Sequence, residues 1–545
     1  MPIGSLELPK QDQASPDTRA LYHNKHPIKM NKILNKIDNL SAKKLYLPLV
    51  LLGMLLATQI QYIQHGWINP DTVLYFESAK LFAQGDWQAA VKVFNWPLYS
   101  ICIAAAHKLT SLDIHTSAQL LSVLFFGITT ASFLKIIELA GGTVRTMYAG
   151  ALVLFSSQYL VGDALEMLMR DQGFWAFYLA SLVFFIKSYQ SKTYVNALLW
   201  QVCAMTATLF RIEAITFLAF LPFLLLLNNE AKWPQRINHL IKCNFLNIIA
   251  AVSILTAIVF SDMSMSQFGR LKEVFSANLF AELTDKFFTH SQIMSELVLG
   301  EYLEEFAVQG LLLTFIYVMI SKTITAAGLI NLGLAAFTCH ARNYLMYAQA
   351  FQVLKAAAII ATINMALIIT KVFVLSGRYV IALGLIVMIL ASFKLADLLK
   401  YLNTTFTSKE KKLKWLTAAI LIFILLGAVK NILPKAEGYN YMQDAGAWVK
   451  VNNKENKPVF YDDSRMRYYA GAPFIGTWND GWAIVISAVN DGSINQYDYL
   501  LISHSTKRPE REKIIVEKLP QFKEVKRFNS VKSKKSIVIY QKIPH

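Results

Sequence analysis

The sequence predicts an α-helical polytopic membrane protein that carries a small soluble α/β domain at its C-terminal end. Of the 545 residues, 55% are hydrophobic and only 16% are charged, whereas a soluble protein has about 25% charged residues. The apolar residues gather in blocks of about 17–25, the length of helix that crosses about 30 Å of hydrocarbon. We therefore expect about 11–13 transmembrane helices.

The net charge of +17 does not indicate a nucleic-acid-binding protein. The basic residues lie mostly in loops between apolar blocks, where an excess of Lys and Arg marks the cytoplasmic side of a membrane. We expect membrane lipids and no nucleic acid as partners. The four cysteines lie in or beside apolar blocks and show no disulfide or zinc spacing; they are Cys102, Cys203, Cys243 and Cys339.

The N-terminal residues, 1–43, are polar and basic, which predicts a cytoplasmic arm without a cleavable signal peptide. The first span covers about 44–62. A first outer loop follows at about 63–115, and the apolar run that begins at Trp96 either crosses the membrane or lies at its interface. Only the interfacial alternative leaves most Lys and Arg of the later loops on one side, so we expect interfacial helices here.

This topology places three charged segments on the outer face. They are the start of the first loop with Asp71, the loop 163–171, and the turn 211–213. Further spans are predicted at about 116–138, 147–162, 172–188, 194–210, 213–228 and 243–261. Carboxylates at membrane boundaries are uncommon and usually functional when they converge, so these segments are the candidate site.

A second long outer loop is predicted at about 262–304, followed by three apolar runs between 305 and 376. Both flanks lie outside, which requires an even number of crossings. Either one run is re-entrant or merged, or the stretch 343–375 is two short helices. The last two spans, about 378–397 and 415–432, enclose a basic cytoplasmic loop. The transmembrane domain is therefore 44–432.

Residues 436–545 alternate strand-like runs with polar helical stretches, which predicts a soluble periplasmic α/β domain. The strand-like runs include 458–461, 499–502 and 536–540. The segment Asp462-Asp463-Ser464-Arg465 follows the first of them and is either a ligand site or a surface turn.

A reaction on the outer face has no nucleoside triphosphate, but it can use a sugar presented as a lipid-linked phosphate. Transfer of that sugar needs a base for the acceptor and cations for the departing phosphate. Asp71 is the candidate base. The candidate cations, which suit phosphate because of their forked donors, are Arg170, Arg211 and Arg378. No sequence pattern requires a cofactor, and a divalent metal stays an open possibility.

Each candidate also has a structural alternative. Asp71 could be a helix N-cap, and Asp171 could pair with Arg170 or cap a helix. Arg211 could pair with Glu213. Arg378 and Tyr379 could be an interfacial anchor, and Trp96 could belong to an interfacial aromatic belt. Glu166 could be an ordinary loop acid, and Asp163 a residue that marks the end of a span.

The order of these segments resembles the GT-C superfamily of integral-membrane glycosyltransferases. The basic N-terminus and first span precede a loop that opens with Asp71 and continues with Gly85-Asp86-Trp87 and Asn95-Trp96-Pro97-Leu98-Tyr99. The Arg170-Asp171 step, the Arg211-Ile212-Glu213 turn and Ser376-Gly377-Arg378-Tyr379 follow. Within the superfamily, the resemblance is to the protein O-mannosyltransferase and aminoarabinose-transferase branch, over residues 44–432.

The resemblance implies a membrane fold, a polyprenyl-phosphate sugar donor, and roles for the matching residues. Asp71 matches the first-loop base and Asp171 the second acid that organises the site, with Asp163 and Glu166 as competitors. Arg378-Tyr379 matches a step near the lipid phosphate. The sequence departs from the family pattern at two places. Thr72 stands where many members have a second acid, which bears on metal use. Asn95-Trp96 stands where aminoarabinose transferases have a Glu-Lys pair, which bears on the donor sugar.

The expected function is transfer of a sugar to a lipid, glycan or protein acceptor at the outer face of a bacterial inner membrane. Asp71 and Asp171 are the expected catalytic residues. Expected substrate-binding residues are Asp163, Glu166, Arg170, Arg211, Glu213, Arg378, Tyr379 and Trp96. The alternatives are a lipid or polysaccharide transporter or flippase, which carries charges at mid-bilayer, and a non-catalytic envelope-polymer assembly protein.

Overall fold

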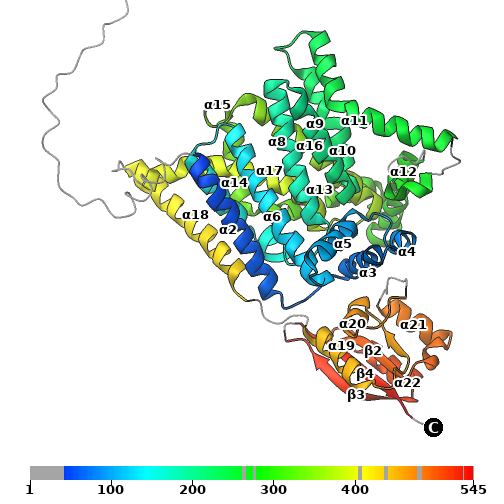
Figure 1. Ribbon diagram of the computed structural model, residues 1–545. Helices are drawn as coiled ribbons and strands as arrows, with labels where there is room; N and C mark the ends of the chain where they lie inside the picture. Colours follow the sequence, from blue (N-terminus) through cyan, green and yellow to red (C-terminus); the bar gives the residue numbers. More distant parts are fainter. Residues whose placement is uncertain are drawn as a thin grey trace, which may run out of the picture.

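The computed structural model (Figure 1) describes residues 42–260, 265–273, 278–402, 408–434, 440–475, 481–531 and 533–543. The predicted basic arm, residues 1–43, lies outside the described residues except for its last two. Most of the described chain is helical, and one sheet lies near the C-terminal end. The predicted fold class is confirmed.

Seven helices of the described chain are long and apolar enough to cross a membrane. They lie within α2 (Ala42–Ile63), α6 (Ile114–Leu139), α11 (Trp233–Phe260), α13 (Ala307–Ala327) with the turn before it, α16 (Ala348–Val372), α17 (Gly377–Leu399) with the turn after it, and α18 (Ser408–Ile432). Four shorter apolar helical stretches lie at Val144–Phe155, Tyr194–Phe210, Ile212–Leu227 and Leu329–His340. The count of 11–13 crossings stays a prediction.

The bundle is organised around α17, which is the most deeply buried of the seven long helices, whereas α11 and α18 lie mostly exposed at its edge. Helices α7 (Val144–Phe155), α13, α14 (Leu329–His340) and α16 pack against α17. A second packed group is formed by α6, α8 (Asp171–Ser191) and α9 (Tyr194–Phe210). One continuous hydrophobic core joins both groups.

Two predicted spans are broken. The span expected at 147–162 ends with α7, and a π-helical segment, η1 (Gln158–Ala164), follows it. The span expected at 213–228 consists of η2 (Ile212–Ala214), α10 (Ile215–Phe220) and the 3-10 segment η3 (Leu221–Leu227). Pro222 lies in the first turn of η3, and because proline lacks an N–H it cannot continue the hydrogen bonding of α10.

The three apolar runs between 305 and 376 form α13, α14 and α16. Gly328, with φ 87°, separates α13 from α14, a backbone conformation that favours glycine. Ala326 lies beside Gly384, and the Thr338 hydroxyl donates to the Leu390 carbonyl at 2.8 Å. Both helices therefore pack against α17, and the choice between the alternatives for this region stays a prediction. A short helix, α15 (Arg342–Leu345), precedes α16.

The first outer loop contains three short helices, α3 (Pro70–Gln84), α4 (Trp87–Val93) and α5 (Leu98–Thr110). Helix α5 begins after Pro97 and has 13 residues, about 20 Å, so it is too short to cross the hydrocarbon. The three helices pack on one another at the end of the bundle that faces the C-terminal domain (Figure 1). This is the arrangement that the interfacial alternative predicts.

The second long loop is also helical within the described residues. It contains η4 (Met265–Glu273), α12 (Leu279–Met294), η5 (Ser295–Leu299) and η6 (Glu304–Phe306). Gly269 has φ 60°, and a Cβ there would lie 2.5 Å from the Asn95 carbonyl oxygen. The second loop therefore approaches the first loop closely at Asn95, beside Trp96. The turn η7 (Lys400–Leu402) follows α17.

The C-terminal domain has a four-stranded sheet in the order β1-β2-β4-β3. β1 (Val459–Tyr461) is parallel to β2 (Tyr499–Ser505), and the pairs β2–β4 (Lys535–Lys542) and β4–β3 (Phe522–Asn529) are antiparallel. The remaining elements are α19 (Asn440–Asn452), α20 (Ser464–Tyr469), α21 (Trp482–Asn490), η8 (Ser493–Gln496) and α22 (Glu510–Lys518). Separate hydrophobic clusters cover the two faces of the sheet.

The C-terminal domain contacts the first outer loop through α20. The Tyr469 hydroxyl accepts a hydrogen bond from the Ile68 N–H at 3.0 Å. The Tyr468 ring lies 5.8 Å from the Phe76 ring, and the Lys80 ammonium lies 5.3 Å from the centre of the Tyr468 ring. The domain is therefore docked on α3, the helix whose first turn carries Asp71.

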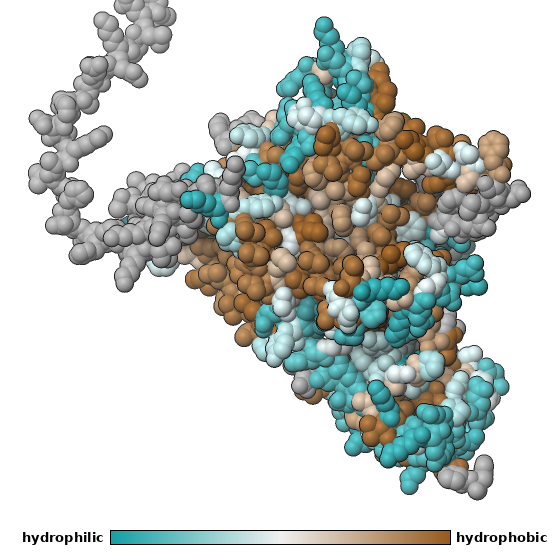
Figure 2. All heavy atoms as spheres, viewed as in Figure 1, coloured by the Kyte–Doolittle hydropathy of each residue, from teal (hydrophilic) through white to brown (hydrophobic). Residues whose placement is uncertain are grey.

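The hydropathy of the surface differs between the helical bundle and the C-terminal domain. Figure 2 shows hydrophobic residues over the middle of the helical bundle and hydrophilic residues over the C-terminal domain and the opposite end of the bundle. Large exposed apolar side chains occur on the outer helices of the bundle, for example Leu55, Leu313 and Phe423. An exposed apolar belt of this kind fits hydrocarbon rather than water.

Candidate active site

Asp71 lies in the first turn of α3 and is not its N-cap. The N-cap is Asn69, whose side chain accepts a hydrogen bond from the Asp71 N–H at 3.0 Å, and Pro70 opens the helix. Proline suits this position because its missing N–H would have no intrahelical partner. Asn69 thus satisfies the Asp71 backbone and leaves the Asp71 carboxylate available, at the positive end of the helix dipole.

The Asp71 carboxylate forms an ion pair with Arg378, which comes from the start of α17 more than 300 residues later. Arg378 Nη1 donates to Asp71 Oδ2 at 2.6 Å. The two side chains are 25% and 29% exposed, so both partners are accessible to a ligand. Gly377 allows this approach, because a Cβ there would meet the Tyr159 ring at 2.4 Å.

A second acid–arginine pair lies buried beside the first. Arg211 Nη1 donates to Asp171 Oδ1, and these side chains are only 4% and 2% exposed. Arg211 also binds Glu213 with two hydrogen bonds, of 3.2 and 3.3 Å. The start of α8 is thereby joined to the end of α9 and to η2. Asp171 pairs with Arg211 rather than with its neighbour Arg170.

Aromatic rings complete the surroundings of Arg211. Its guanidinium carbon lies 4.5 Å from the centre of the Tyr379 ring and 6.0 Å from that of Phe174. A small cavity of about 20 Å³ lies among these side chains and Arg378, enough for about one water molecule. Tyr379 therefore contacts Arg211 and lines the same cavity as Arg211 and Arg378.

Arg170 lies at the same site and has a hydrogen-bond donor that no described residue uses. Its guanidinium lies 5.4 Å from the centre of the Phe94 ring. Its Nη1 atom is buried and has no hydrogen-bond partner within the described chain. A buried N–H without a partner costs about 1–3 kcal/mol, which an anionic ligand that accepts from this nitrogen would offset.

Tyr75 on α3 lies close to several charged groups of the site. Burial raises the pKa of the Tyr75 phenol to about 12. Four charged groups lie close enough to act on this pKa: Arg170, Asp71, Asp171 and Arg378. The outer-loop residues that the sequence predicts as the site are therefore gathered at one end of the bundle.

The loop that leads to Arg170 is fixed by polar side chains. Gln61 and Gln172 both donate to the Leu165 carbonyl at 2.8 Å. The Thr72 hydroxyl donates to the Leu168 carbonyl at 3.1 Å. Thr72 thus links α3 to this loop.

Asp163 and Glu166 lie at the edge of the site. Asp163 is exposed on η1, and Glu166 is half-buried in the turn that follows. Asp163 is close enough to Tyr159 to act on it electrostatically, as are Asp171, Arg211 and Arg378. Asp171 forms the buried pair with Arg211, and the choice of the second acid among Asp171, Asp163 and Glu166 stays a prediction.

Trp96 is buried, and its indole N–H donates to the Thr208 carbonyl at 3.2 Å. This bond joins the first outer loop to α9. The residue contributes to the position of the loop, and its predicted contact with a sugar stays a prediction.

The structure adds residues that the sequence analysis did not single out. Tyr159, Tyr75, Gln61 and Gln172 lie in or behind the site and hold or border its charged groups. Arg270 on η4 lies close enough to Glu213 to act on it electrostatically. Each lies within an apolar or loop segment that has no catalytic signature, so only the fold reveals its place.

Within the described residues, no three His, Cys, Asp or Glu side chains are grouped as metal ligands. The cations that the site itself supplies are Arg170, Arg211 and Arg378. Two of these are held by carboxylates, and the third has a free buried donor. The arrangement can hold an anion beside a partly exposed carboxylate, which suits acid–base chemistry on a phosphate-linked substrate.

The Asp462–Arg465 segment, where the sequence left a ligand site and a surface turn open, forms an internal junction. Asp462 is buried and accepts from the Ser503 N–H at 2.7 Å and from the Ser503 hydroxyl at 3.0 Å. Asp463 caps α20 and pairs with Arg465 at 2.7 Å. These bonds join β1, β2 and α20.

Comparison with known proteins identifies the fold. No family model and no curated protein sequence matches the chain. Among solved structures, ArnT from Cupriavidus metallidurans in its apo state superposes with a TM-score of 0.51 at 12% identity, over 92% of this chain and 98% of ArnT. The chain therefore shares the fold of ArnT, which agrees with the fold that its segment order predicts.

The mycobacterial arabinofuranosyltransferase AftD is also similar, with TM-scores of 0.46 and 0.45 in two structures at 11% and 12% identity. These matches cover 92% and 93% of this chain but only 42% and 40% of AftD. AftD is thus a much longer protein, and the account of this chain depends on the more complete match to ArnT.

Proposed function

We propose that the protein is a glycosyltransferase that moves a sugar from a polyprenyl-phosphate donor to a lipid, glycan or protein acceptor. The observation that carries this proposal is the accessible Asp71–Arg378 pair, backed by the buried Asp171–Arg211 pair. The GT-C fold supports it, because ArnT is a GT-C aminoarabinose transferase. The sugar of this chain's donor is not implied by that name.

In the proposed reaction, a carboxylate oxygen of Asp71 takes the proton of the acceptor hydroxyl. The acceptor oxygen then forms a bond to the anomeric carbon of the sugar. The bond between that carbon and the phosphate oxygen breaks, and its electron pair stays on the polyprenyl phosphate. A single displacement of this kind inverts the anomeric configuration, and a positioned base contributes about 10²–10⁴-fold to the rate.

Arg378 and Arg170 are the proposed phosphate-binding groups. A guanidinium has five N–H donors, and the described structure uses one nitrogen of Arg378 for Asp71. The other donors of Arg378 and the unpartnered Nη1 of Arg170 can bind phosphate oxygens. Charge that develops on the leaving phosphate is then stabilised by donors that are already in place.

Asp171, Arg211 and Glu213 have a positioning role in this proposal. Arg211 is occupied by two carboxylates and is nearly inaccessible, so it is less suited to phosphate than the sequence suggests. Its pairs hold the start of α8 and the turn after α9 together. Asp171 therefore organises the site as the resemblance implies, through Arg211 rather than through the substrate.

The proposed location is the inner (plasma) membrane of a bacterium, with the N-terminus cytoplasmic and the C-terminal domain periplasmic. The apolar belt supports a multi-pass membrane protein. The site and the C-terminal domain lie at the same end of the bundle, so the donor sugar would be presented on the outer face.

The experiment that tests this function is transfer in proteoliposomes. Purified full-length protein is supplied with a panel of radiolabelled polyprenyl-phosphate sugars, with the matching nucleotide sugars as controls, and with a membrane extract as acceptor. We expect label transfer from one polyprenyl-phosphate sugar and none from nucleotide sugars. Movement of labelled lipid across the bilayer without transfer would contradict the proposal and favour the flippase alternative.

A further inference from the structure

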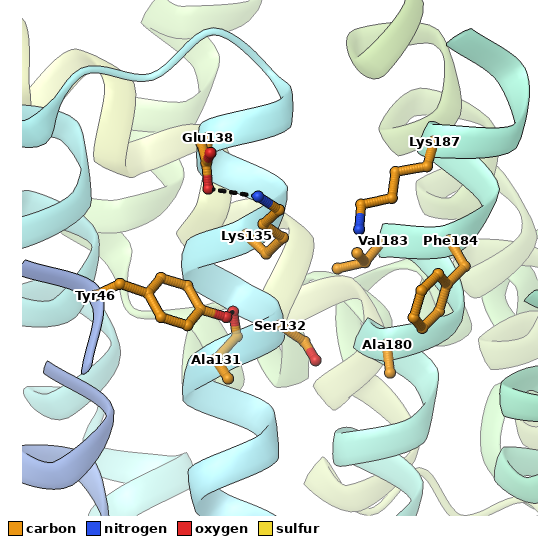
Figure 3. Close-up of a pocket in the computed structure, with 9 residues that line it drawn as sticks. All are labelled: Tyr46, Ala131, Ser132, Lys135, Glu138, Ala180, Val183, Phe184 and Lys187. Carbon is orange, nitrogen blue, oxygen red and sulfur yellow. Dashed lines mark hydrogen bonds and ion pairs between the residues drawn. The ribbon is translucent and has the colours of Figure 1, made fainter. Parts of the chain in front are cut away.

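A second charged pocket opens at the far end of the bundle, between α2, α6 and α8, with a volume of about 470 Å³. Figure 3 shows its lining residues: Tyr46, Ala131, Ser132, Lys135, Glu138, Ala180, Val183, Phe184 and Lys187. Lys187 and Asp171 lie on the same helix, 16 positions apart, which is about 24 Å of helix. The pocket is therefore separate from the candidate active site.

The pocket has one positive charge in excess. Lys135 forms an ion pair with Glu138 at 2.8 Å, one turn away on α6. Lys187 forms no ion pair with any described carboxylate, and its ammonium lies 5.2 Å from the centre of the Phe184 ring. Glu138 is close enough to act on Lys187 electrostatically but is held in an ion pair by Lys135. An anion that enters the pocket would thus meet a lysine that forms no ion pair of its own.

The direction of Lys187 distinguishes it from an ordinary lysine at the end of a membrane helix. Such a lysine extends its ammonium past the helix end toward water. Figure 3 shows that the Lys187 side chain instead runs back toward the level of Val183, into the gap between α6 and α8. The charge is therefore directed into the pocket.

Ser132 supplies a second polar group to the same gap. Its side chain is only 8% exposed, yet its hydroxyl makes no hydrogen bond to any described residue. By contrast, Thr129 and Thr130 on the same helix donate to carbonyls four residues earlier, at 2.8 and 2.9 Å. Ser132 and Lys187 thus leave two donors available from facing helices.

The rest of the lining is apolar or already satisfied. The Tyr46 hydroxyl donates to the Ala131 carbonyl at 2.7 Å, which fixes α2 against α6 on one side. Ala180 and Val183 give an apolar face on α8 below the charged groups. A ligand that fits this lining has an anionic head and apolar chains.

We propose that this pocket binds the headgroup of an anionic glycerophospholipid, such as phosphatidylglycerol. The phosphate oxygens accept from the Lys187 ammonium and the Ser132 hydroxyl, and the acyl chains follow the apolar face of α8. In the topology that we expect, the pocket lies toward the cytoplasmic leaflet, where basic pockets between helices bind anionic headgroups. This inference is independent of the proposed transfer reaction.

The test is native mass spectrometry of the delipidated full-length protein in detergent. It is titrated with phosphatidylglycerol and with phosphatidylcholine of the same acyl chains. We expect phosphatidylglycerol to bind about fivefold more tightly, because one lysine near an anionic lipid contributes about 1 kcal/mol. Equal affinity for the two lipids would overturn the proposal.

Three variants locate the site. Lys187→Gln should bind phosphatidylglycerol no better than phosphatidylcholine, and Lys187→Arg should keep the preference. Lys192→Gln is the matched control. Lys192 is exposed at the end of the same helix, and this variant removes the same positive charge. A preference that survives Lys187→Gln, or that falls equally in Lys192→Gln, would contradict the proposal. Displacement of the lipid by equimolar inorganic phosphate would identify a free-phosphate site instead.

Discussion

At the scale of single residues, the two acid–arginine pairs differ in what surrounds them. Asp71 and Arg378 are about one-quarter exposed, whereas Asp171 and Arg211 are almost completely buried. An accessible pair can exchange partners with a substrate at little cost. A buried charge that loses its partner is strongly destabilising, by about 3–5 kcal/mol. The accessible Asp71–Arg378 pair is therefore suited to catalysis, and the buried Asp171–Arg211 pair is suited to holding the site together.

Asp171→Asn should lower the thermal stability of the protein, because Arg211 would keep only Glu213 as a charged partner. We expect a loss toward the lower end of about 3–5 kcal/mol, since the Glu213 bonds remain. Thermal melting of the purified protein in detergent measures the effect. Asp285→Asn, at an exposed position on α12, is the matched control, and equal melting of the two variants would refute the supporting role.

The sequence predicts the members of the site better than their partners. Order along the chain and the charge bias of the loops place Asp71, Asp171, Arg211 and Arg378 on one face. The Arg211–Glu213 pair could also be predicted, because the two residues are neighbours in one turn. The Asp71–Arg378 and Asp171–Arg211 pairs depend on helix packing across 307 and 40 residues, which no local pattern encodes.

At the scale of structural elements, α20 and α3 form the contact through which the C-terminal domain reaches the site. The Tyr469 hydroxyl accepts from Ile68 and lies 3.5 Å from the Gly66 carbonyl, just before Asn69 caps α3. The segment that leads into α3 is therefore held by the domain. Movement of α20 would be transmitted to Asp71 through only a few backbone residues.

Tyr469→Phe should leave the Ile68 N–H without its partner and loosen the segment before α3. An unsatisfied buried N–H costs about 1–3 kcal/mol, so the Ile68 amide should exchange with deuterium about 5- to 150-fold faster. Hydrogen-exchange mass spectrometry of peptides over 64–75 measures this. Tyr302→Phe removes an exposed hydroxyl and should change nothing; unchanged exchange in Tyr469→Phe would show that the contact does not hold α3.

The β1–β2 junction should make the C-terminal domain sensitive to pH. Burial raises the pKa of Asp462 to about 7, so the folded domain binds this proton more tightly than the unfolded chain does. The contribution to stability is complete below the unfolded pKa of about 4 and is lost as the pH rises to about 7, by up to about 4 kcal/mol.

Asp462→Asn tests this sign, because the amide resembles the protonated carboxyl group and does not titrate. Hydrogen exchange of β1 and β2 should accelerate between pH 5 and pH 8 in the wild type, after correction for intrinsic exchange, and stay level in the variant. Asp444→Asn, at an exposed position on α19, should behave as the wild type. Parallel pH profiles for wild type and Asp462→Asn would contradict the assignment.

The elements show where sequence patterns succeed and where they fail. The ends of the predicted spans 44–62 and 378–397 agree closely with α2 and α17, because long apolar blocks are unambiguous. The segment 213–228 reads as one apolar block, but Pro222 breaks it. The strand β3 was not among the named strand-like runs, since it is an edge strand whose residues are mostly exposed and charged.

At the scale of the whole molecule, the apolar belt separates two polar ends (Figure 2). The candidate active site and the C-terminal domain lie at one end, and the Lys187 pocket lies at the other. The charge bias of the loops predicts that the first end faces outward, and this orientation stays a prediction. No sequence pattern predicts that the C-terminal domain docks on α3.

Reporter fusions test this orientation. Alkaline phosphatase fused after His545 should be active, and the same enzyme inserted after Thr405, between the ends of η7 and α18, should be inactive, because it folds only outside the cytoplasm. Fluorescent protein fusions at the same two positions should give the reverse pattern. Active phosphatase at the Thr405 insertion would invert the topology and would place the candidate site on the cytoplasmic face.

The most direct test of the central claim is sugar transfer by Asp71→Asn in proteoliposomes, with Asp285→Asn as the control. Asn keeps the shape of Asp but cannot accept the acceptor proton. We predict that the initial rate falls by at least about 100-fold, while donor binding and thermal melting stay close to those of the control. Near-full activity of folded Asp71→Asn would show that Asp71 is not the base and would contradict the proposed mechanism.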